Sequence, residues 1–176
     1  FKKRRQFAKN GSPLAEATLS VMYADFTGAD MTDIAESEFT RKGNPCGITK
    51  EWCLVVDDFN LNGWAYYDED NSTSYLYGSN NANGSSYGAP MVSGGIALLA
   101  QAFPNHTPEQ LTSRVLASAN NGWFTADGNT TFTTHGASIT HGYNDTWGHG
   151  LPDFYAALSP ITSNANPASF VVGGGE

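Results

Sequence analysis

Basic residues are scarce in this sequence. Lysine and arginine together number nine against 17 aspartates and glutamates, which gives a formal net charge of −8 at pH 7. Four of the nine lie at residues 2–5, so the rest of the chain is more acidic still. An acidic surface repels phosphate groups, so we expect neither nucleic acid nor an anionic membrane surface as a partner. We interpret the basic group as a solvated approach to the first strand rather than a phosphate-binding patch.

Long apolar runs are also missing. None approaches the roughly 20 residues that a helix needs to cross a bilayer, so no membrane span is expected. The sequence begins at Phe1 without a signal peptide, from which we expect a processed product or a fragment. Its 176 residues are 40% hydrophobic, enough for one domain with a sizeable core.

Cysteine occurs only twice, at Cys46 and Cys53, with six residues between them. Zinc is disfavoured because two thiolates without nearby further ligands do not complete a tetrahedron. Two buried thiols are an open alternative. Pro45 and Gly47 let the chain fold back, and an even count suits an oxidising compartment, so a short-loop disulfide is favoured. Abundant Asn, Gly, Ser and Thr also resemble the composition of exported proteins.

The segment 84–90, Gly-Ser-Ser-Tyr-Gly-Ala-Pro, is the most informative part of the chain. Ser86 follows an asparagine- and serine-rich loop and opens an apolar helix predicted over residues 86–102. A hydroxyl at a helix N-terminus lies beside unpaired N–H groups and the positive end of the helix dipole. These conditions suit an acyl-transfer nucleophile, whose oxyanion needs donors fixed in advance. Ser86 is therefore our candidate nucleophile.

The predicted helix 86–102 has two further features. Its apolar residues surround much of the cylinder and its glycines remove bulk, so we expect burial on most sides. Pro90 is tolerated only in a first turn, which predicts a helix start near Ser86.

The rest of the sequence alternates strand and helix patterns. Residues 52–56 are apolar throughout, typical of a buried strand in a parallel sheet. Thr107, Pro108 and Gln110 form a capping box that begins a second helix, ended by residues 120–122. We also expect strands at 6–8 and 19–23, a turn at 10–13, loop over most of 25–37, a hairpin through 64–67 and 75–77, short strands within 123–149 and a last helix at 151–158.

Three segments carry a resemblance to a known family. Residues 84–99 closely resemble the serine motif of the subtilisin-like serine peptidases, G-[TS]-S-x-[AG]-x-P followed by valine, a small pair and an apolar helix. Residues 147–158 resemble that family's closing segment, a G-x-G turn leading into the last helix. Residues 46–53 resemble the C-G-x-x-K-x-W-C stretch of the bacterial autotransporter members, which are secreted to the cell surface.

The resemblance implies a fold and a domain organisation. It covers residues 6–158 and implies an α/β fold, a parallel sheet flanked by helices, represented here by its C-terminal half. Residues 159–176 are then a linker or the start of a following region. Half a sheet leaves an edge and an apolar helix face exposed, so we expect the isolated chain to be poorly stable.

The resemblance also implies endopeptidase chemistry on a protein or peptide substrate, with Ser86 as nucleophile. Residues 7–17 resemble a worn form of the family's oxyanion turn, A-x-G-N-x-G, with Lys9 in place of glycine and Gly11 one position early. This assigns Asn10 as oxyanion donor, a plain Asn-Gly turn being the alternative. The family's Asp and His precede that asparagine, so an upstream part of the same domain would supply them and the chain alone should be inactive.

Two other functional interpretations compete with this one. All four histidines follow Ser86, and residues 84–88 satisfy G-x-S-x-G, as in α/β-hydrolases. However, a polar loop at 78–83 precedes Ser86 where a nucleophile elbow needs a buried strand. The second alternative is a non-catalytic exported module derived from a peptidase half. The family's A-P-G is replaced by Val56-Asp57-Asp58, so the substrate preference is not readable from the sequence.

The remaining polar residues favour structural roles. We expect His106 to be exposed, His149 to form local hydrogen bonds, and His135 with His141 to bind no metal. No cofactor is expected. Structural calcium at Asp127, Asp145 or residues 68–70 is an alternative to a solvated acidic loop, which we favour.

Overall fold

The computed structural model describes residues 17–28, 33–57, 84–133 and 138–160, together with the backbone of 64–67 and 75–78. The predicted strand 6–8, the turn 10–13 and most of the predicted linker 159–176 lie outside these residues.

A three-stranded sheet lies at the centre of the structure, in the order β2-β1-β3. β1 (Ser20–Phe26) and β3 (Cys53–Asp57) run parallel, with Ser20 opposite Cys53, which confirms the two predicted strands. β2 (Phe39–Arg41) is antiparallel to β1 and pairs with residues 24–26. That pairing extends β1 to residue 26, the start of the segment 25–37 that is predicted to be mostly loop. The 3₁₀ helices η1 (Glu36–Glu38) and η2 (Gly47–Trp52) precede β2 and β3.

Both faces of the β1–β3 pair are covered, as the apolar character of β3 predicts. Leu54 and Val56 face one core, which includes residues of α3 and α4, whereas Cys53 and Val55 face a second core. The second core is rich in aromatic rings, with Phe39 stacked on Trp123 at 4.3 Å between centroids. Alternate strand residues therefore belong to two separate cores.

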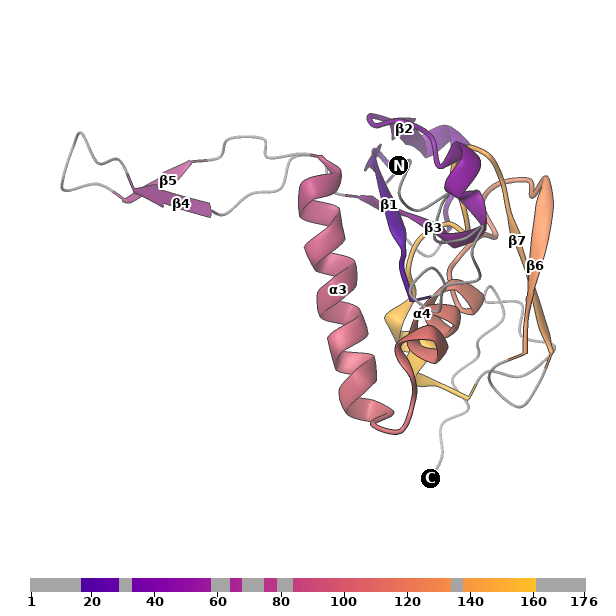
Figure 1. The fold of residues 1–176 in the computed structure, drawn as a ribbon. Helices are drawn as coiled ribbons and strands as arrows, with labels where there is room; N and C mark the ends of the chain where they lie inside the picture. The colour runs from indigo at the N-terminus through magenta and orange to yellow at the C-terminus, as the bar shows by residue number, and fades with distance from the viewer. Residues whose placement is uncertain are drawn as a thin grey trace, which may run out of the picture.

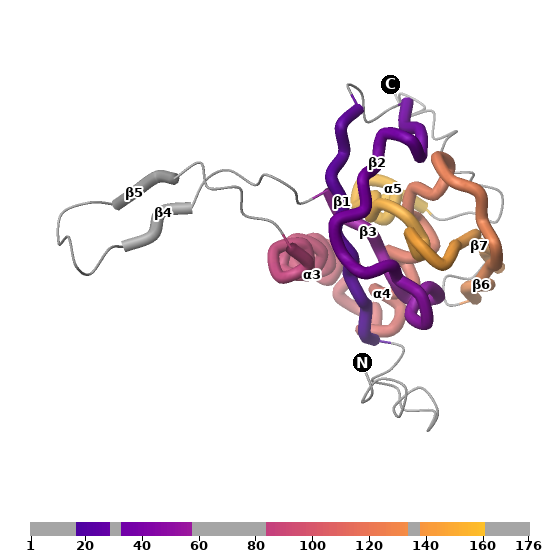
Figure 2. Tube along the Cα trace, turned by 90° about the horizontal axis from the view of Figure 1, so that it is seen from above, coloured from indigo at the N-terminus to yellow at the C-terminus, as the bar shows by residue number. Residues whose placement is uncertain are grey.

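Helices and hairpins surround this sheet. α3 (Ser85–Ala102) lies along one side of β1 and β3, and the hairpin of β6 (Gly128–Phe132) and β7 (Ile139–Tyr143) lies on the opposite side in both views (Figures 1 and 2). β4 (Trp64–Tyr67) and β5 (Tyr75–Gly78) pair antiparallel and confirm the predicted hairpin. In the described part of the chain, no helix combines the length and hydropathy that a bilayer span requires.

α3 is much less covered than its sequence predicts. A single stripe is buried, formed by Gly88, Val92, Gly95 and Leu99. Met91 and Leu98 are 49% and 62% exposed, so the prediction of burial on most sides is wrong. The helix packs on β1, α4 and α5, which together cover one stripe only.

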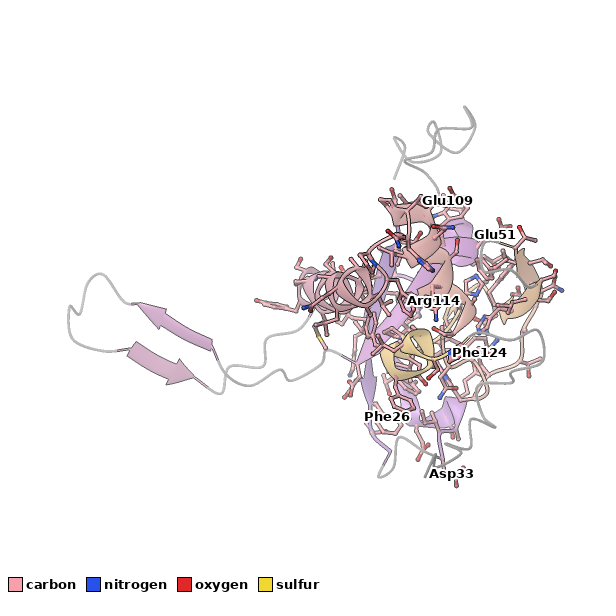
Figure 3. All side chains as sticks on the ribbon, turned by 90° about the horizontal axis from the view of Figure 1, so that it is seen from below. Phe26, Asp33, Glu51, Glu109, Arg114 and Phe124 are labelled. Atoms are coloured by element: carbon pink, nitrogen blue, oxygen red, sulfur yellow. A yellow bond between two sulfur atoms is a disulfide. The ribbon has the colours of Figure 1, made fainter. Side chains whose placement is uncertain are left out.

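α4 (Pro108–Ala117) begins with the predicted capping box. Thr107 Oγ1 accepts the N–H of Gln110 at 3.2 Å, and Gln110 Oε1 accepts the N–H of Thr107 at 2.8 Å. The helix ends before the predicted residues 120–122, because Asn120 exchanges two backbone hydrogen bonds with Leu151. Arg114 lies between α4 and α5 (Figure 3), where its guanidinium donates to the carbonyls of Ala157 and Ser159.

The first part of the closing segment, residues 147–153, covers the outer edge of β3. His149 donates its N–H to Cys53 O at 2.8 Å, and Gly150 O accepts the N–H of Val55 at 2.9 Å. This edge is therefore paired rather than exposed. Leu151 pairs with Asn120 and is not helical, so α5 (Phe154–Leu158) begins three residues later than predicted, with Asp153 as its N-cap.

Candidate active site

Ser86 is the second residue of α3, and its side chain is exposed. Gly84 precedes the helix with a φ of 128°, a conformation that glycine adopts without strain. The N–H of Tyr87 bonds to Gly84 O at 2.9 Å and closes the first turn. The N-cap residue Gly84 makes no side-chain cap hydrogen bond. The backbone N–H groups at a helix N-terminus and the positive end of its dipole favour a developing negative charge.

Pro90 alters the hydrogen bonding directly behind the serine. It is the sixth residue of α3, in the second turn and not in the first as the sequence predicted. A residue with an N–H at this position would bond to the carbonyl of residue 86, and proline has none. The Ser86 carbonyl therefore lacks its helical donor.

An open cavity of about 580 Å³ adjoins this end of α3. Ser85 of α3, residues 20–23 of β1 and residues 41–46 line it. Cys46 and Cys53 also line it, and they form the predicted disulfide, with an S–S distance of 2.05 Å. The disulfide thus connects the cavity's wall to β3. A cavity of this size next to the candidate nucleophile can hold a substrate side chain.

α3 is held against the rest of the molecule by close packing at Gly95. A Cβ built on Gly95 would overlap the ring of Phe154 in α5, whereas one built on Gly94 meets no atom within 4 Å. At Gly95 the missing side chain leaves room for the Phe154 ring, so the expected removal of bulk by glycine is confirmed there. This contact helps position the helix that carries Ser86.

None of the three described histidines is placed to act as a base for Ser86. His106 follows the far end of α3, whose 18 residues span about 27 Å. It is partly buried against the Phe103 ring, not exposed as predicted. His141 lies on β7, across the sheet from α3 (Figures 1 and 2). His149 is fully buried, with both ring nitrogens in contact with other groups.

Burial lowers the pKa of both core histidines. The pKa of His149 falls to about 3 because it is buried and because His141 lies beside it. Burial also lowers the pKa of His141, against the carbonyls of Ala119 and Gly142, which raise it. Both rings are therefore neutral at pH 7.

Asp127 and Asp145 both form salt bridges with one lysine. Lys50 Nζ lies 3.2 Å from Asp127 Oδ1 and 2.6 Å from Asp145 Oδ1. These two carboxylates raise the pKa of Lys50. The pKa of Asp127 is lowered by a hydrogen bond from the backbone N–H of Asp145 and by the charged side chain of Lys50. The acidic loop is thus paired with a cation, and within the described residues no three His, Cys, Asp or Glu side chains gather as a metal site would require.

Several predicted residues lie outside the part of the chain that the structure describes. They include Asn10, the candidate oxyanion donor, and His135, as well as the acidic residues 68–70. The structure therefore gives the position of Ser86 but not of Asn10.

Sequence reasoning missed the buried histidine pair. His141 and His149 contact each other and the backbone of two distant segments, so His149 forms long-range hydrogen bonds rather than local ones. The sequence feature that could have revealed this pair is the glycine on each side of His149. Gly148 and Gly150 have φ of 59° and 92°, and a Cβ on either would overlap the backbone of Cys53 or Asn120. Such close approach implies a buried residue between them.

Two comparisons with known proteins complete the description of the site. A family model, that of the subtilase family (Peptidase_S8), matches residues 11–150. The match includes the serine at the start of α3 and reaches Gly150 in the closing segment. No curated protein matches the sequence.

Proposed function

Because the chain belongs to the subtilase family of serine peptidases, we propose that it forms the C-terminal half of an endopeptidase domain with Ser86 as nucleophile. The single observation that best supports this role is the exposure of Ser86 in the first turn of α3, beside an open cavity. In this proposal the peptidase domain runs through residue 158, and residues 159–176 are a linker or the start of a following region.

The proposed reaction is acyl transfer to Ser86. Its Oγ attacks the carbonyl carbon of a peptide bond while a histidine takes the hydroxyl proton, and an aspartate orients that histidine. The Ser86 N–H and the Asn10 amide stabilise the oxyanion, and removal of one such donor costs about 3–4 kcal/mol in comparable enzymes. Expulsion of the amine, which takes up the proton, leaves an acyl-enzyme that water hydrolyses.

We infer that the histidine and aspartate come from residues that precede this chain in the complete domain. The positions of His106, His141 and His149 support this inference, since one lies at the far end of α3 and the other two are buried and neutral. Without its base, Ser86 retains only binding and oxyanion effects. The 176-residue chain by itself should therefore be inactive.

The arrangement of strands favours a subtilase over an α/β-hydrolase. A nucleophile elbow follows a central strand of the main sheet. The strand that precedes Ser86 here, β5, pairs with β4 and is not one of the strands in β2-β1-β3. This supports the peptidase interpretation of the serine motif.

We also propose that the protein acts outside the cytoplasm, at a bacterial cell surface, on protein or peptide substrates. The Cys46–Cys53 disulfide supports an oxidising compartment. No cofactor takes part in the proposed reaction.

A fluorophosphonate probe tests the proposal, because it labels an activated serine. We expect no labelling of the 176-residue chain. We expect labelling at Ser86 in the protein extended by the residues encoded before Phe1, detected by mass spectrometry of the labelled peptide. Ser86→Ala should abolish the signal. Ser93→Ala is the matched control on the same helix, since its hydroxyl bonds to the carbonyl oxygen of Ala89 at 2.9 Å, and it should keep the signal.

Two outcomes would contradict the proposal. Labelling of the 176-residue chain that disappears on replacement of His135 would support a base within the chain, as in the α/β-hydrolase alternative. A folded, extended protein without labelling would support the non-catalytic exported module.

A further inference from the structure

His141 and His149 form a buried chain of polar contacts between four segments. Their Nδ1 atoms lie 2.8 Å apart. His141 Nε2 lies 2.8 Å from the carbonyl oxygen of Ala119, just after α4. His149 Nε2 lies 3.1 Å from the carbonyl oxygen of Glu51 in η2. The two rings are 4% and 0% exposed, so water does not replace any of these contacts.

The three contacts require more protons than two neutral rings carry. A carbonyl oxygen only accepts, so each Nε2 must carry a hydrogen to bond to its carbonyl. The contact between the two Nδ1 atoms requires a third hydrogen. Two neutral imidazoles have one N–H each. Either the pair holds one extra proton and a positive charge, or one of the three contacts lacks its hydrogen.

Burial favours the neutral histidine pair over the positively charged one. An uncompensated cation in the interior costs more free energy than one unsatisfied polar contact. We assign the missing hydrogen to the longest contact, His149 Nε2 to Glu51 O at 3.1 Å. His149 then carries its proton on Nδ1 and donates it to His141 Nδ1, while His141 donates from Nε2 to Ala119 O.

The ionisable groups around the pair do not compensate a charge on it. The Glu51 carboxylate lies 3.4 Å from the Tyr143 hydroxyl, and Glu51 lies beside the β6–β7 hairpin in Figure 3. Lys50 is engaged by two aspartates, and Arg114 by carbonyls at the end of α5. The groups on the neighbouring elements are Lys50 and Glu51 of η2, Tyr143 of β7, Arg114 of α4, and Asp127 and Asp145 beside the hairpin.

We propose that His141 and His149 act as a buried acid-sensitive switch, which holds the closing segment on β3 while neutral and releases it when protonated. Two protonated rings 2.8 Å apart would repel each other inside the core. His149 is also the residue whose N–H bonds to Cys53 O at the edge of β3. Charging the pair therefore separates β7, η2 and the closing segment.

Urea unfolding at pH 7 and pH 5 tests the switch. An unfolded histidine with a pKa near 6.5 takes up a proton over this range, whereas folded His149, whose pKa burial lowers to about 3, does not. His149 should therefore raise the unfolding equilibrium constant by about 25-fold, and His141, whose pKa burial also lowers, should add to this rise. His149→Gln should reduce the rise by about 25-fold and His141→Gln should reduce it as well, whereas the control His106→Gln should leave the contribution of the pair unchanged. Equal pH dependence in all four proteins would overturn the proposal.

A measurement on the unaltered chain keeps the proposal testable if a variant does not fold. Long-range ¹H–¹⁵N spectra at pH 7 identify which ring nitrogen carries the proton. We expect Nε2–H for His141 and Nδ1–H for His149. A charged ring at pH 7, or Nε2–H on both residues, would overturn the inference.

Discussion

Gly94 and Gly95 are consecutive residues of α3 with opposite expected responses to the same substitution. A Cβ on Gly94 would meet no atom within 4 Å, whereas one on Gly95 would overlap the Phe154 ring. Gly94 is exposed and Gly95 is buried. Substitution by alanine at both positions therefore separates helix propensity from packing, in the helix that carries Ser86.

The expected magnitudes follow from these surroundings. Alanine is favoured over glycine in a helix interior by about 1 kcal/mol, so Gly94→Ala should stabilise the protein by about that amount. Gly95→Ala gains the same propensity but must displace the Phe154 ring. Overpacking costs about 1–3 kcal/mol, and loss of burial for an aromatic side chain adds to it. The net destabilisation should be about 1–2 kcal/mol, so the two variants should differ by about 2–3 kcal/mol.

Urea unfolding at pH 7, followed by tryptophan fluorescence, measures both changes, since Trp123 and Trp147 are buried. The denaturant slope should stay constant, so that the midpoint alone reports stability. In a Phe154→Ala background the ring is absent, and Gly95→Ala should become stabilising by about 1 kcal/mol, like Gly94→Ala.

Two results would refute this reasoning. If Gly95→Ala stabilised the protein as much as Gly94→Ala, the ring would not pack against the helix as described. If the penalty persisted in the Phe154→Ala background, its cause would lie elsewhere than in the contact with α5.

Three further predictions concern stability. Burial holds the folded pKa of His149 at about 3, below the unfolded value near 6.5, so the folded state binds fewer protons. The stability that this difference in pKa contributes is fully present above pH 6.5 and is lost as pH falls toward 3. The free energy of unfolding should therefore fall by about 2 kcal/mol between pH 7 and pH 5, as urea midpoints at each pH would show. Replacement of both Cys46 and Cys53 by alanine should cost about 2–3 kcal/mol, because the disulfide closes a short loop in the unfolded chain; reducing agent should then have no further effect on the urea midpoint. Thr107→Ala should cost about 1 kcal/mol through loss of the capping box, whereas Thr107→Ser should retain most of it, as thermal melts by circular dichroism would show.

Local signals in the sequence predicted much of the fold. The capping box at Thr107 and the apolar strand before Asp57 were correct because their causes lie within a few residues. The short disulfide was predicted for the same reason, since residues 45–47 let the chain fold back. The last helix was predicted too early because Leu151 pairs with Asn120, a partner that no local pattern reveals.

The candidate site, like the fold, was predictable from the sequence only in part. The position of Ser86 at a helix start follows from the segment 84–90, where glycine before the helix and apolar residues after it act locally. The exposure of Leu98 could not be predicted, because an apolar pattern shows which surface can be buried but not whether a neighbour covers it.

The sequence by itself therefore determined the serine-bearing helix, the parallel strands and the family, because propensity, capping and alternation are properties of short segments. Only the tertiary structure decided which helix face is covered, that the closing segment pairs with β3, and that His141 meets His149. Those outcomes depend on groups far apart in the chain, and Glu51 and His149, 98 residues apart, are the clearest case. At Ser86 the structure supplies an exposed hydroxyl in the first turn of a helix, and it excludes the described histidines as its base by their burial and position.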